Sequence, residues 1–562
     1  MSRFLITSAL PYINGVKHLG NLVGSMLPAD VYSRFLRAQG HEVLFVCGTD
    51  EHGTPAEVAA INAGVGVKEY CDTQFERQRG LGDKFWLSWD HFGRSSSPEN
   101  HELTRYFSDR LDRNGYLEER EIKQLYSPSD RRFLPDRYVT GTCPQCQYPR
   151  ARGDQCESCS RLLDPLELVD PRSTLSGATN LEVRTTRHLF LRQSAFEDRL
   201  RRWIDTRRAW PTLTTSIARK WLDEGLRDRC ITRDLEWGVP VDRPEFENKV
   251  YYVWFDAPIE YIGATREWAS QHTDDHRDWR SWWYNAADVV YTQFMAKDNI
   301  PFHTLSFPCT LLGSAEPWKL PDYIKGFNWL TYYGGKFSTS ASRGIFMDDA
   351  IALLPPDYWR WFLIANAPEN DDVDFTWEIF ADTVNKDLAD VLGNFVNRVL
   401  TFTDKHFSGE VPTAGTPGAP EEQLADEVRT GIARYTAALT GLNFRVAAAE
   451  LRHIWSLGNQ YWDVKRPWHT LSSDPDDAAS TVRTAVNLIS AISVLSAPVI
   501  PQTAAAISAA VHDVPARTGW PGADHELNRI RAGARITNPG ILFTKVLQEQ
   551  VEAWRQRFGA SE

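Results

Sequence analysis

Near the start of the chain, two segments have the apolar pattern of a strand, and the segment between them has the apolar spacing of a helix. Phe4–Ser8 is a short apolar run that ends at Leu10-Pro11, which is typical of a buried strand and its exit turn. From about Leu19 to Gln39 the apolar residues recur at helical spacing, and Gly40 stands at the position of a C-terminal cap. Glu42–Cys47 is again rich in β-branched and aromatic residues. Strand, helix and strand with short joints predict a βαβ unit, and hence a parallel sheet that binds ligands at the carboxyl ends of its strands.

The pattern changes character further along the chain. Pro98 begins another helix, which Asn114-Gly115 ends. From about residue 116 to 230, short strands, turns and a cysteine cluster indicate an inserted module. Tyr251–Phe255 and Val289–Phe294 return to the buried-strand pattern, so the first domain is expected to resume there.

The last part of the chain carries almost no strand signal. From about Asn385 it is expected to form long helices, interrupted by the Pro- and Gly-rich stretch Pro412–Pro420. Its final segment, Thr544–Phe558, is predicted to be one more amphipathic helix. The predicted fold class is therefore α/β, with a split parallel-sheet domain followed by an α-helical bundle.

Composition narrows the class of protein. At ~100–200 residues per domain, a chain of 562 residues is expected to form three or four domains. Its 42% hydrophobic and 24% charged residues are ordinary for a soluble globular protein. The formal net charge of −12 is unfavourable for binding phosphates, which Lys and Arg neutralise. A local basic groove is compatible with an acidic total, so charge does not decide whether the chain binds nucleic acid.

The lack of a recognisable targeting signal and the scattered cysteines predict the cellular compartment. No run approaches the ~18 apolar residues that span a bilayer, and the start lacks the basic leader and cleavage pattern of a signal peptide. Four isolated cysteines fit a reducing compartment: Cys47, Cys71, Cys230 and Cys309. A cytoplasmic protein that does not enter a membrane is expected.

The other four cysteines form two C-x-x-C pairs. Cys143 and Cys146 are separated by nine residues from Cys156 and Cys159. Each pair can chelate from a tight turn, and four thiolates suit a tetrahedral Zn²⁺ with bonds of ~2.3 Å. The alternatives are two disulfides or four free thiols. A four-thiolate site leaves no open position for a catalytic water, so the predicted zinc is structural.

Two further stretches contain residues suited to binding a nucleoside triphosphate. In Pro11–Asn21, His18 and Asn21 lie three residues apart at an expected helix start, where imidazole and amide donors suit polyphosphate, and Gly20 lets a flat base approach the backbone. Much later, Gly334–Ser340 is a glycine turn that carries Lys336 and several hydroxyls, a plausible clamp on pyrophosphate. Taken alone, each motif is more often ordinary structure.

Together the two stretches resemble a known family. His18-Leu19-Gly20-Asn21 resembles the first signature of class I aminoacyl-tRNA synthetases, and Lys336-Phe337-Ser338-Thr339-Ser340 resembles their second, the mobile Lys-Ser loop. Five longer strings resemble methionyl-tRNA synthetases in particular: Ala9–Gly20, Gly48–Gly53, Phe133–Arg137, Tyr252–Pro258 and Ala296–His303. The resemblance extends from about residue 4 to the C-terminal helix.

This resemblance implies a reaction and a set of residues. Methionine and ATP form methionyl-adenylate and pyrophosphate, and methionine then passes to the 3′ adenosine of initiator and elongator tRNA(Met). The implied catalytic residues are His18, Asn21, Lys336 and Arg233. The implied ATP site comprises His18, Gly20, Asn21, Asp298, Lys336, Ser338, Thr339 and Ser340, with Mg²⁺ accompanying ATP. The implied methionine site comprises Leu10, Tyr12, Asp50, Trp254, Ala257, Pro258, Tyr261, Phe302 and His303.

The resemblance also implies a tRNA site and a domain plan. Asn394, Arg398 and Trp468 match the family's contacts to the CAU anticodon, whereas Trp468 read alone fits a buried interhelical Trp equally well. Trp254, Tyr261 and Phe302 read alone fit an ordinary core. The implied segments are residues 1–115 and 231–325 (two halves of a Rossmann-like catalytic domain), 116–230 (a zinc-bearing connective insertion), 326–384 (a stem-contact region with the Lys-Ser loop) and 385–562 (an α-helical anticodon-binding domain). A monomer is expected, because no further C-terminal tRNA-binding module follows.

Three positions depart from the family pattern. Asn21 replaces a usual His, Thr339 replaces a usual Lys, and Glu260 replaces a usual Gly. They motivate one rival hypothesis: a degenerate or inhibitor-resistant duplicate that binds tRNA with altered activity. A second rival is a class I synthetase for leucine, isoleucine, valine or cysteine, which the cysteine cluster and the methionine-pocket strings disfavour.

Overall fold

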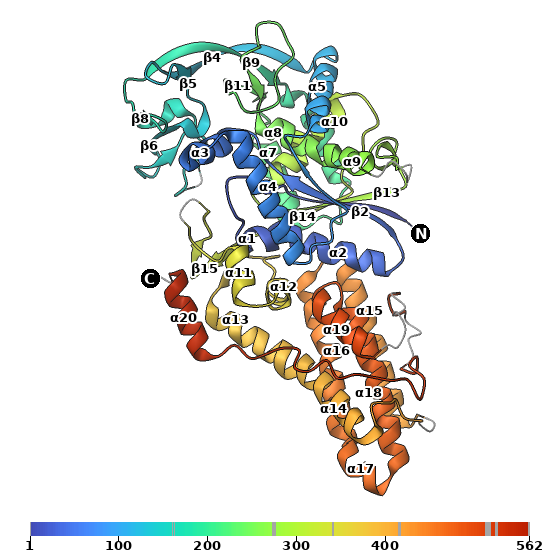
Figure 1. Ribbon diagram of the computed structural model, residues 1–562. Coiled ribbons are helices and arrows are strands. Elements are labelled where there is room, and N and C mark those ends of the chain that lie inside the picture. The colour runs from blue at the N-terminus through green and yellow to red at the C-terminus, as the bar shows by residue number, and fades with distance from the viewer. Residues whose placement is uncertain are drawn as a thin grey trace.

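A parallel sheet of five strands forms the centre of the N-terminal half, as the computed structural model of the chain shows (Figure 1). The structure describes residues 2–159, 161, 163–271, 277–339, 342–413, 417–511, 519–522 and 527–559. The strand order is β14-β13-β1-β2-β3. Their bounds are β1 Arg3–Ser8, β2 Glu42–Thr49, β3 His91–Arg94, β13 Val289–Ala296 and β14 Tyr323–Phe327.

The predicted βαβ unit is confirmed. β1 pairs in parallel with β2 and with β13, so strands from both ends of the N-terminal half meet side by side. One continuous helix connects β1 to β2, through α1 (Leu19–Asn21), the π-helical η1 (Leu22–Met26) and α2 (Leu27–Ala38). Gly40 follows it with φ of 81°, a left-handed conformation that glycine adopts without strain. The helix α5 (Pro98–Arg113) also begins and ends where its cap residues predict.

The prediction of a buried strand over Tyr251–Phe255 is wrong. Only Val250–Tyr251 (β12) is a strand, paired with β11 (Thr232–Arg233), and Val253–Asp256 forms the helix α8. A short apolar run fits a buried helix as well as a strand, and Pro258 favours a helical turn, which continues through η5 (Ala257–Ile259) into α9 (Glu260–Ser270).

Two antiparallel sheets lie in the stretch between α5 and β11. The first contains the long strands β4 (Leu117–Ser127) and β9 (Glu182–Leu191), flanked by β5 (Arg132–Phe133) and β10 (Arg229–Cys230). The second contains β6 (Val139–Thr142), β7 (Ala151–Arg152) and β8 (Val169–Ser173), with the cysteine cluster beside it. The helices α6 (Glu197–Asp205) and α7 (Thr212–Asp223) follow. The prediction of strands and turns is correct here, but β4 and β9 are not short.

Helices dominate the C-terminal part. They are α12 (Pro356–Ala365), α13 (Trp377–Val384), η9 (Asn385–Gly393), α14 (Asn394–Phe407), α15 (Ala419–Thr440), α16 (Phe444–Lys465), α17 (Pro467–Ser473), α18 (Pro475–Ser496), α19 (Pro501–Val511) and α20 (Gln548–Phe558). The last helix begins four residues later than predicted from Thr544, because side chains hold the preceding residues extended. Tyr358 bonds both backbone groups of Thr544 at 2.8 and 2.9 Å, and Asn385 bonds both of Val546 at 2.7 and 2.8 Å.

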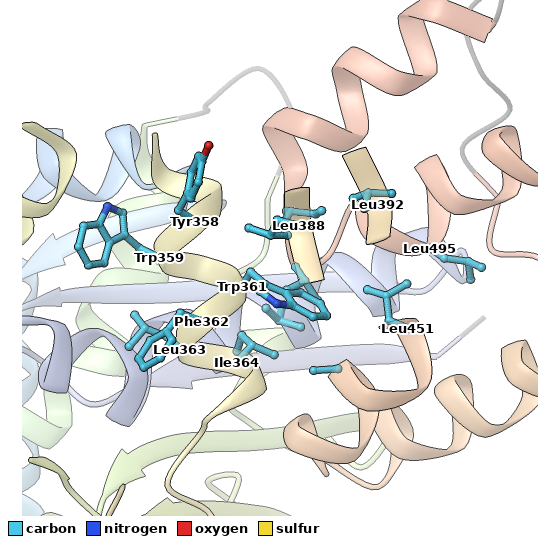
Figure 2. Packing of buried hydrophobic residues seen from close by; sticks show 14 of the residues in the cluster. Tyr358, Trp359, Trp361, Phe362, Leu363, Ile364, Leu388, Leu392, Leu451 and Leu495 are labelled. Atoms are coloured by element: carbon cyan, nitrogen blue, oxygen red, sulfur yellow. The ribbon is translucent and has the colours of Figure 1, made fainter. Parts of the chain in front are cut away.

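A continuous apolar core joins the sheet to the helices. Figure 2 shows α12 at its centre, with Tyr358, Trp359, Trp361, Phe362, Leu363 and Ile364 packed near Leu388, Leu392, Leu451 and Leu495. The same cluster includes Ile6 and Phe45 of the sheet. Among the described residues, α18 is the one helix long and apolar enough to cross a membrane, but 78% of its apolar window is buried, as in the core of a helical bundle.

Candidate active site

A cavity of about 270 Å³ lies at the carboxyl ends of β1 and β13. Six of the predicted site residues line it: Leu10, His18, Gly20, Asn21, Asp298 and Lys336. Two chain segments more than 300 residues apart therefore form opposite walls of one cavity. Parallel α/β sheets bind ligands at this edge.

Backbone hydrogen bonds fix the two walls to each other. The amide of Leu19 donates to the carbonyl of Ile345 at 3.0 Å, and the amide of Met347 donates to the carbonyl of Lys17 at 2.9 Å. Phe346 lies between them and pairs with His18 in an isolated β-bridge. The segment that follows the Lys-Ser loop is thus paired directly with the segment that begins the first helix.

His18 and Asn21 cap that helix reciprocally. The backbone amide of Asn21 donates to Nδ1 of His18, and the backbone amide of His18 donates to Oδ1 of Asn21, both at 3.2 Å. Burial, with the nearby charge of Lys17, lowers the pKa of His18 to about 3, so the imidazole is neutral at pH 7. Because Nδ1 accepts a hydrogen bond, the proton belongs on Nε2, and His18 can donate one hydrogen bond from that atom. Asn21 occupies the third position of the helix, from which its side chain completes the capping box with His18.

The opposite wall is a hairpin followed by a closed loop. β15 (Leu330–Tyr332) pairs with β16 (Gly335–Lys336), and two backbone hydrogen bonds of 3.1 and 2.9 Å between Ser338 and Arg343 close the next turn. Thr339 lies in that turn, close to Gly15 of the other wall, where a methyl group of Thr339 would be 3.4 Å from an added Cβ. Ser340 lies outside the described residues.

The indole of Trp329 contacts two lysines beside this hairpin. Nζ of Lys336 lies 4.3 Å from the centre of the indole, and Nζ of Lys297 lies 4.1 Å from it. Lys297 also pairs with Asp372 at 2.7 Å. Sequence reasoning missed Trp329, although its place seven residues before Lys336 was a usable signal. Cation–π contact with a tryptophan holds an ammonium group without neutralising its charge.

The predicted methionine residues gather beside the cavity. Nε1 of Trp254 donates to Oη of Tyr12 at 3.0 Å, and the Trp254 and Phe302 rings lie 4.7 Å apart. Trp254 and Phe302 are only half-buried, so they are not simply core residues. Ala257 and Pro258 lie on the turn that follows Trp254, and Pro258 also lines a small space behind that indole.

A second polar pair lies deeper in the same region. His303 donates from Nδ1 to the carbonyl of Asn299 at 2.9 Å, so its Nε2 accepts from the Tyr261 hydroxyl at 2.8 Å. Burial lowers the pKa of His303 to about 4, which keeps the ring neutral. Tyr261 is buried, so its ring belongs to the core while its hydroxyl orients His303.

Asp50 is buried with one carboxylate oxygen that has no hydrogen-bond partner among the described residues. Its backbone pairs with the segment that carries Tyr12, since its amide donates to Pro11 and its carbonyl accepts from Ile13, both at 2.9 Å. Burial raises the pKa of Asp50 well above its ordinary value, and nearby Asp256 and Glu51 add to the rise. A cationic group placed beside this carboxyl would restore its charge.

Arg233 is already paired. Its Nε donates to Asp136 at 3.1 Å, and its guanidinium carbon lies 3.6 Å from the centre of the Tyr252 ring. Arg233 does not line the cavity that holds His18 and Lys336. Asp136 lies in Phe133–Arg137, one of the strings that resemble the family, but its pairing with Arg233 was not predicted, because 97 residues separate the two.

Glu260 is fully buried and does not line the cavity. Neither of its carboxyl oxygens has a hydrogen-bond partner among the described residues. Two glycines make room for it: a Cβ on Gly93 would lie 2.5 Å from Oε1, and one on Gly263 would lie 2.6 Å from Oε2. Burial raises the pKa of this carboxyl well above its ordinary value.

The four clustered cysteines converge. Their sulfur atoms all lie within 4.8 Å of one another, with 4.0 Å between Cys143 and Cys159 and 3.6 Å between Cys146 and Cys156. Bonds of ~2.3 Å in a tetrahedron place sulfurs about 3.8 Å apart, whereas a disulfide needs ~2.05 Å. The described cysteines are unpaired by disulfides, and the cluster fits a zinc ion.

The predicted anticodon residues form a surface group at the far end of the helices. Nδ2 of Asn394 donates to Asn459 at 3.4 Å, and Arg398 pairs with Asp463 at 2.7 Å. The guanidinium carbon of Arg398 lies 5.7 Å from the centre of the Trp468 ring. Trp468 is 43% exposed, which rules out the buried interhelical alternative.

The fold and the cavity, with its two facing signature segments, define a class I aminoacyl-tRNA synthetase. Residues 4–400 match the sequence model of the family described as tRNA synthetases class I (M), and residues 411–562 match that of the anticodon binding domain of methionyl tRNA ligase. The chain therefore belongs to the methionyl-tRNA synthetase family.

Relatives and a solved structure agree with this. Proteins named methionine–tRNA ligase from Streptomyces avermitilis and Caulobacter vibrioides are each 56% identical to this chain, over all of it and all of their own length. One named methionine–tRNA ligase 1, from Acaryochloris marina, is 55% identical over 99% of this chain and all of its own. Mycobacterium tuberculosis methionyl-tRNA synthetase, solved in complex with methionyl-adenylate, shares the fold with a TM-score of 0.78 at 23% identity, over 97% of this chain and all of that one. Neither rival hypothesis from the sequence is favoured by these matches.

Proposed function

We propose that this chain is a methionine–tRNA ligase. It activates L-methionine with ATP to methionyl-adenylate and pyrophosphate, and it transfers methionine to the 3′ adenosine of initiator and elongator tRNA(Met). The observation that carries the proposal is the cavity between His18 and Lys336, whose walls are joined by backbone hydrogen bonds. The full-length similarity to proteins of that name supports it.

The Mg²⁺ complex of ATP occupies the cavity in this proposal. Gly20 lets adenine approach the backbone, and Asp298 binds the ribose. The Nε2–H of neutral His18 donates to the phosphates from one wall, and the ammonium group of Lys336 approaches them from the other. Asn21 acts on His18 through the capping hydrogen bonds. Hydroxyls of Ser338, Thr339 and Ser340 supply further donors to the phosphates.

Methionine binds beside ATP. Its ammonium group pairs with the unpartnered oxygen of Asp50 and with the Leu10 carbonyl. Its thioether contacts Tyr12, Trp254 and Phe302, where sulfur–aromatic contact contributes ~0.3–1.5 kcal/mol. Ala257, Pro258, Tyr261 and His303 complete the pocket, and the hydrogen bond between the last two fixes the His303 ring.

The reaction then follows from position and charge. An oxygen of the methionine carboxylate attacks the α-phosphorus, and the bond to the bridging oxygen breaks with its electron pair leaving on pyrophosphate. Charge accumulates on that leaving group, where His18 and Lys336 stabilise it. Arg233, held by Asp136, orients the substrates from outside the cavity. The 2′-hydroxyl of the terminal tRNA adenosine then attacks the carbonyl of the adenylate and releases AMP.

Three other parts of the chain complete the proposal. Trp468 stacks on an anticodon base while Asn394 and Arg398 bond base edges. Cys143, Cys146, Cys156 and Cys159 hold one structural Zn²⁺. The chain works as a cytoplasmic monomer, divided at the boundaries predicted above: 1–115, 116–230, 231–325, 326–384 and 385–562.

Methionine-dependent exchange of pyrophosphate into ATP tests the proposal. The wild-type chain should exchange with methionine and not with leucine, isoleucine, valine or cysteine. Lys336→Ala should lose more than ~10-fold, as expected for a charged donor to a developing anion. Lys297→Ala is the matched control, because Lys297 contacts the same indole but is paired with Asp372. Exchange with another amino acid, or none at all, would overturn the assignment.

A further inference from the structure

A buried ion pair joins the helical bundle to the sheet domain. Arg360 of α12 and Asp30 of α2 are both fully buried, and Nη2 of Arg360 donates to Oδ2 of Asp30 at 2.6 Å. The two residues are 330 positions apart in the chain. Burying two charges is expensive unless every polar atom is satisfied, so the neighbours of this pair are informative.

The three nitrogens of the Arg360 guanidinium all have partners, and these partners lie on three segments. Nε donates to the carbonyl of Val499 at 2.8 Å, and Nη2 also donates to that of Pro498 at 2.9 Å. Nη1 donates to the carbonyl of Phe85 at 3.0 Å. Arg360 therefore holds the turn between α18 and α19 against the segment that follows α4 (Val67–Lys84).

The Asp30 carboxylate is equally saturated. Oδ2 also accepts from Nε of Arg34 at 3.0 Å, and Oδ1 accepts from the amide and the hydroxyl of Ser88 at 2.7 and 2.6 Å. We call Arg360, Asp30 and their bonded groups the junction. Arg360 bonds both the turn at Val499 and Asp30 of α2, so a shift of that turn must displace α2 or break hydrogen bonds.

Both ends of this connection lead to proposed functional residues. On the sheet side, α2 continues the helix that begins at His18, twelve residues before Asp30, or about 18 Å at 1.5 Å per residue. On the bundle side, α18 has 22 residues, a length of about 33 Å. In the first turn of α18, Asp477 pairs with Lys465, which precedes the helix that contains Trp468. In its last turn, the Ser496 hydroxyl accepts from Nε1 of Trp455 at 3.1 Å. Figure 1 shows α17 and the start of α18 at the tip and α19 next to α2.

We propose that Arg360 and Asp30 are positioning residues, which transmit the placement of the anticodon-binding tip along α18 to the helix that begins at His18. This rests on the proposed function. The pair touches neither substrate, and its role belongs to the tRNA-dependent step. Rigid elements joined by a saturated polar contact provide a physical route between two sites.

The test separates tRNA-dependent from tRNA-independent activity. Asp30→Leu combined with Arg360→Met removes both fully buried charges at once, a change that proteins often tolerate, and Arg34, which loses its carboxylate partner, is 22% exposed and within reach of water. Pyrophosphate exchange without tRNA should stay within ~3-fold of wild type, because the cavity is intact. The ratio of kcat/KM between tRNA with CAU and tRNA with one altered anticodon base should fall by ~10-fold or more, in the range of measured couplings between sites.

A second ion pair provides the matched control. Lys325 of β14 pairs with Glu369 at 2.7 Å, and Glu369 accepts from the amides of Phe444 and Arg445 at the start of α16. This pair also connects sheet to bundle, but it does not contact α2. Lys325→Met combined with Glu369→Gln should leave anticodon discrimination intact.

Each outcome has one meaning. A folded Asp30→Leu/Arg360→Met variant with unchanged discrimination would overturn the role of the junction, as would equal losses in both double variants or a parallel loss of exchange and charging. If that variant does not fold, Arg360→Lys, which keeps the charge but not the full set of bonds, is measured the same way, with the same two results possible. Absence of exchange in the wild-type chain would instead refute the proposed function.

Discussion

The methionine pocket and the anticodon surface proposed here differ in what their polar side chains do in the free protein. In the pocket, one hydrogen bond between Tyr12 and Trp254 and another between Tyr261 and His303 fix the rings, while one oxygen of Asp50 has no partner in the described part of the chain. On the surface, Arg398 and Asn394 are both occupied by protein partners, Asp463 and Asn459. A small ligand thus meets a site that is already arranged, whereas RNA must exchange contacts that the protein makes with itself.

The difference follows from burial. An ionised carboxylate without a partner is costly to bury, so the pKa of Asp50 is raised, and a ligand cation beside it would favour the charged form. An exposed ion pair contributes only ~0–1 kcal/mol, so its exchange for a nucleic-acid contact costs little. The two sites therefore represent preorganised and exchangeable recognition.

The largest effect is expected where the buried carboxyl that faces the ligand cation is removed. Asp50→Asn should lower kcat/KM for methionine in pyrophosphate exchange by ~100-fold or more, since truncating one partner of a buried charge pair costs 2–5 kcal/mol. The KM for ATP should stay within ~3-fold, because Asp50 does not line the ATP cavity. A uniform loss in both substrates would show that Asp50 supports the fold and not the ligand.

A smaller effect is expected on the anticodon side, and only with tRNA. Trp468→Ala should lower kcat/KM for tRNA(Met) charging by ~5–150-fold, the equivalent of one stacked base at 1–3 kcal/mol. Exchange without tRNA should not change, since Trp468 is on the surface of α17. Val464→Ala is the matched control, because Val464 is a neighbouring apolar residue with 73% exposure. Equal losses in the two variants would point to general surface disruption.

Local sequence patterns specified part of this molecule and tertiary contacts specified the rest. The first helix, its Gly40 cap and the strands β1, β2 and β13 follow from spacing, because their apolar faces pack on one core. Val253–Asp256 could not be assigned from the sequence, since the short apolar run Val253-Trp254-Phe255 fits either a helix or a strand. The same limit explains the late start of α20, where Tyr358 and Asn385 hold the backbone from a distance.

The candidate site divides in the same way. His18, Asn21 and Lys336 lie in short signatures, so the sequence alone indicates them. Trp329 lies seven residues before Lys336 and Asp136 lies in the string Phe133–Arg137, but their contacts to Lys336 and Arg233 form only in the folded chain. The departure at position 21 is compatible with the structure, because Asn21 accepts the backbone N–H of the N-cap residue His18.

Glu260 allows a test of the cost of buried charge away from both sites. The pKa of Glu260 is raised in the folded chain. At a pH above its ordinary pKa near 4.5, the unfolded state therefore releases a proton that the folded state still holds. Stability is therefore lost as pH rises above that value. Glu260→Gln cannot ionise and should gain about 1–3 kcal/mol in free energy of unfolding at pH 8, with a smaller gain at pH 5.

The measurement is the melting temperature of both proteins across that pH range. Glu121→Gln is the control, because Glu121 is an exposed glutamate of β4 and should show no pH-dependent gain. A gain for Glu260→Gln that does not vary with pH would show that shape, and not charge, limits this position.

The smallest effect is expected from the contact that RNA must displace. Asp463 is 60% exposed and holds Arg398, which is 31% exposed. Asp463→Asn should therefore free Arg398 and remove a negative charge near the RNA, lowering KM for tRNA(Met) by ~2–5-fold, which corresponds to the ~0–1 kcal/mol of a surface pair. Stability should barely change. Asp463→Glu keeps the charge and serves as the comparison. A higher KM in the Asn variant would mean that Asp463 orients Arg398 for the anticodon, and the surface would then be preorganised like the pocket.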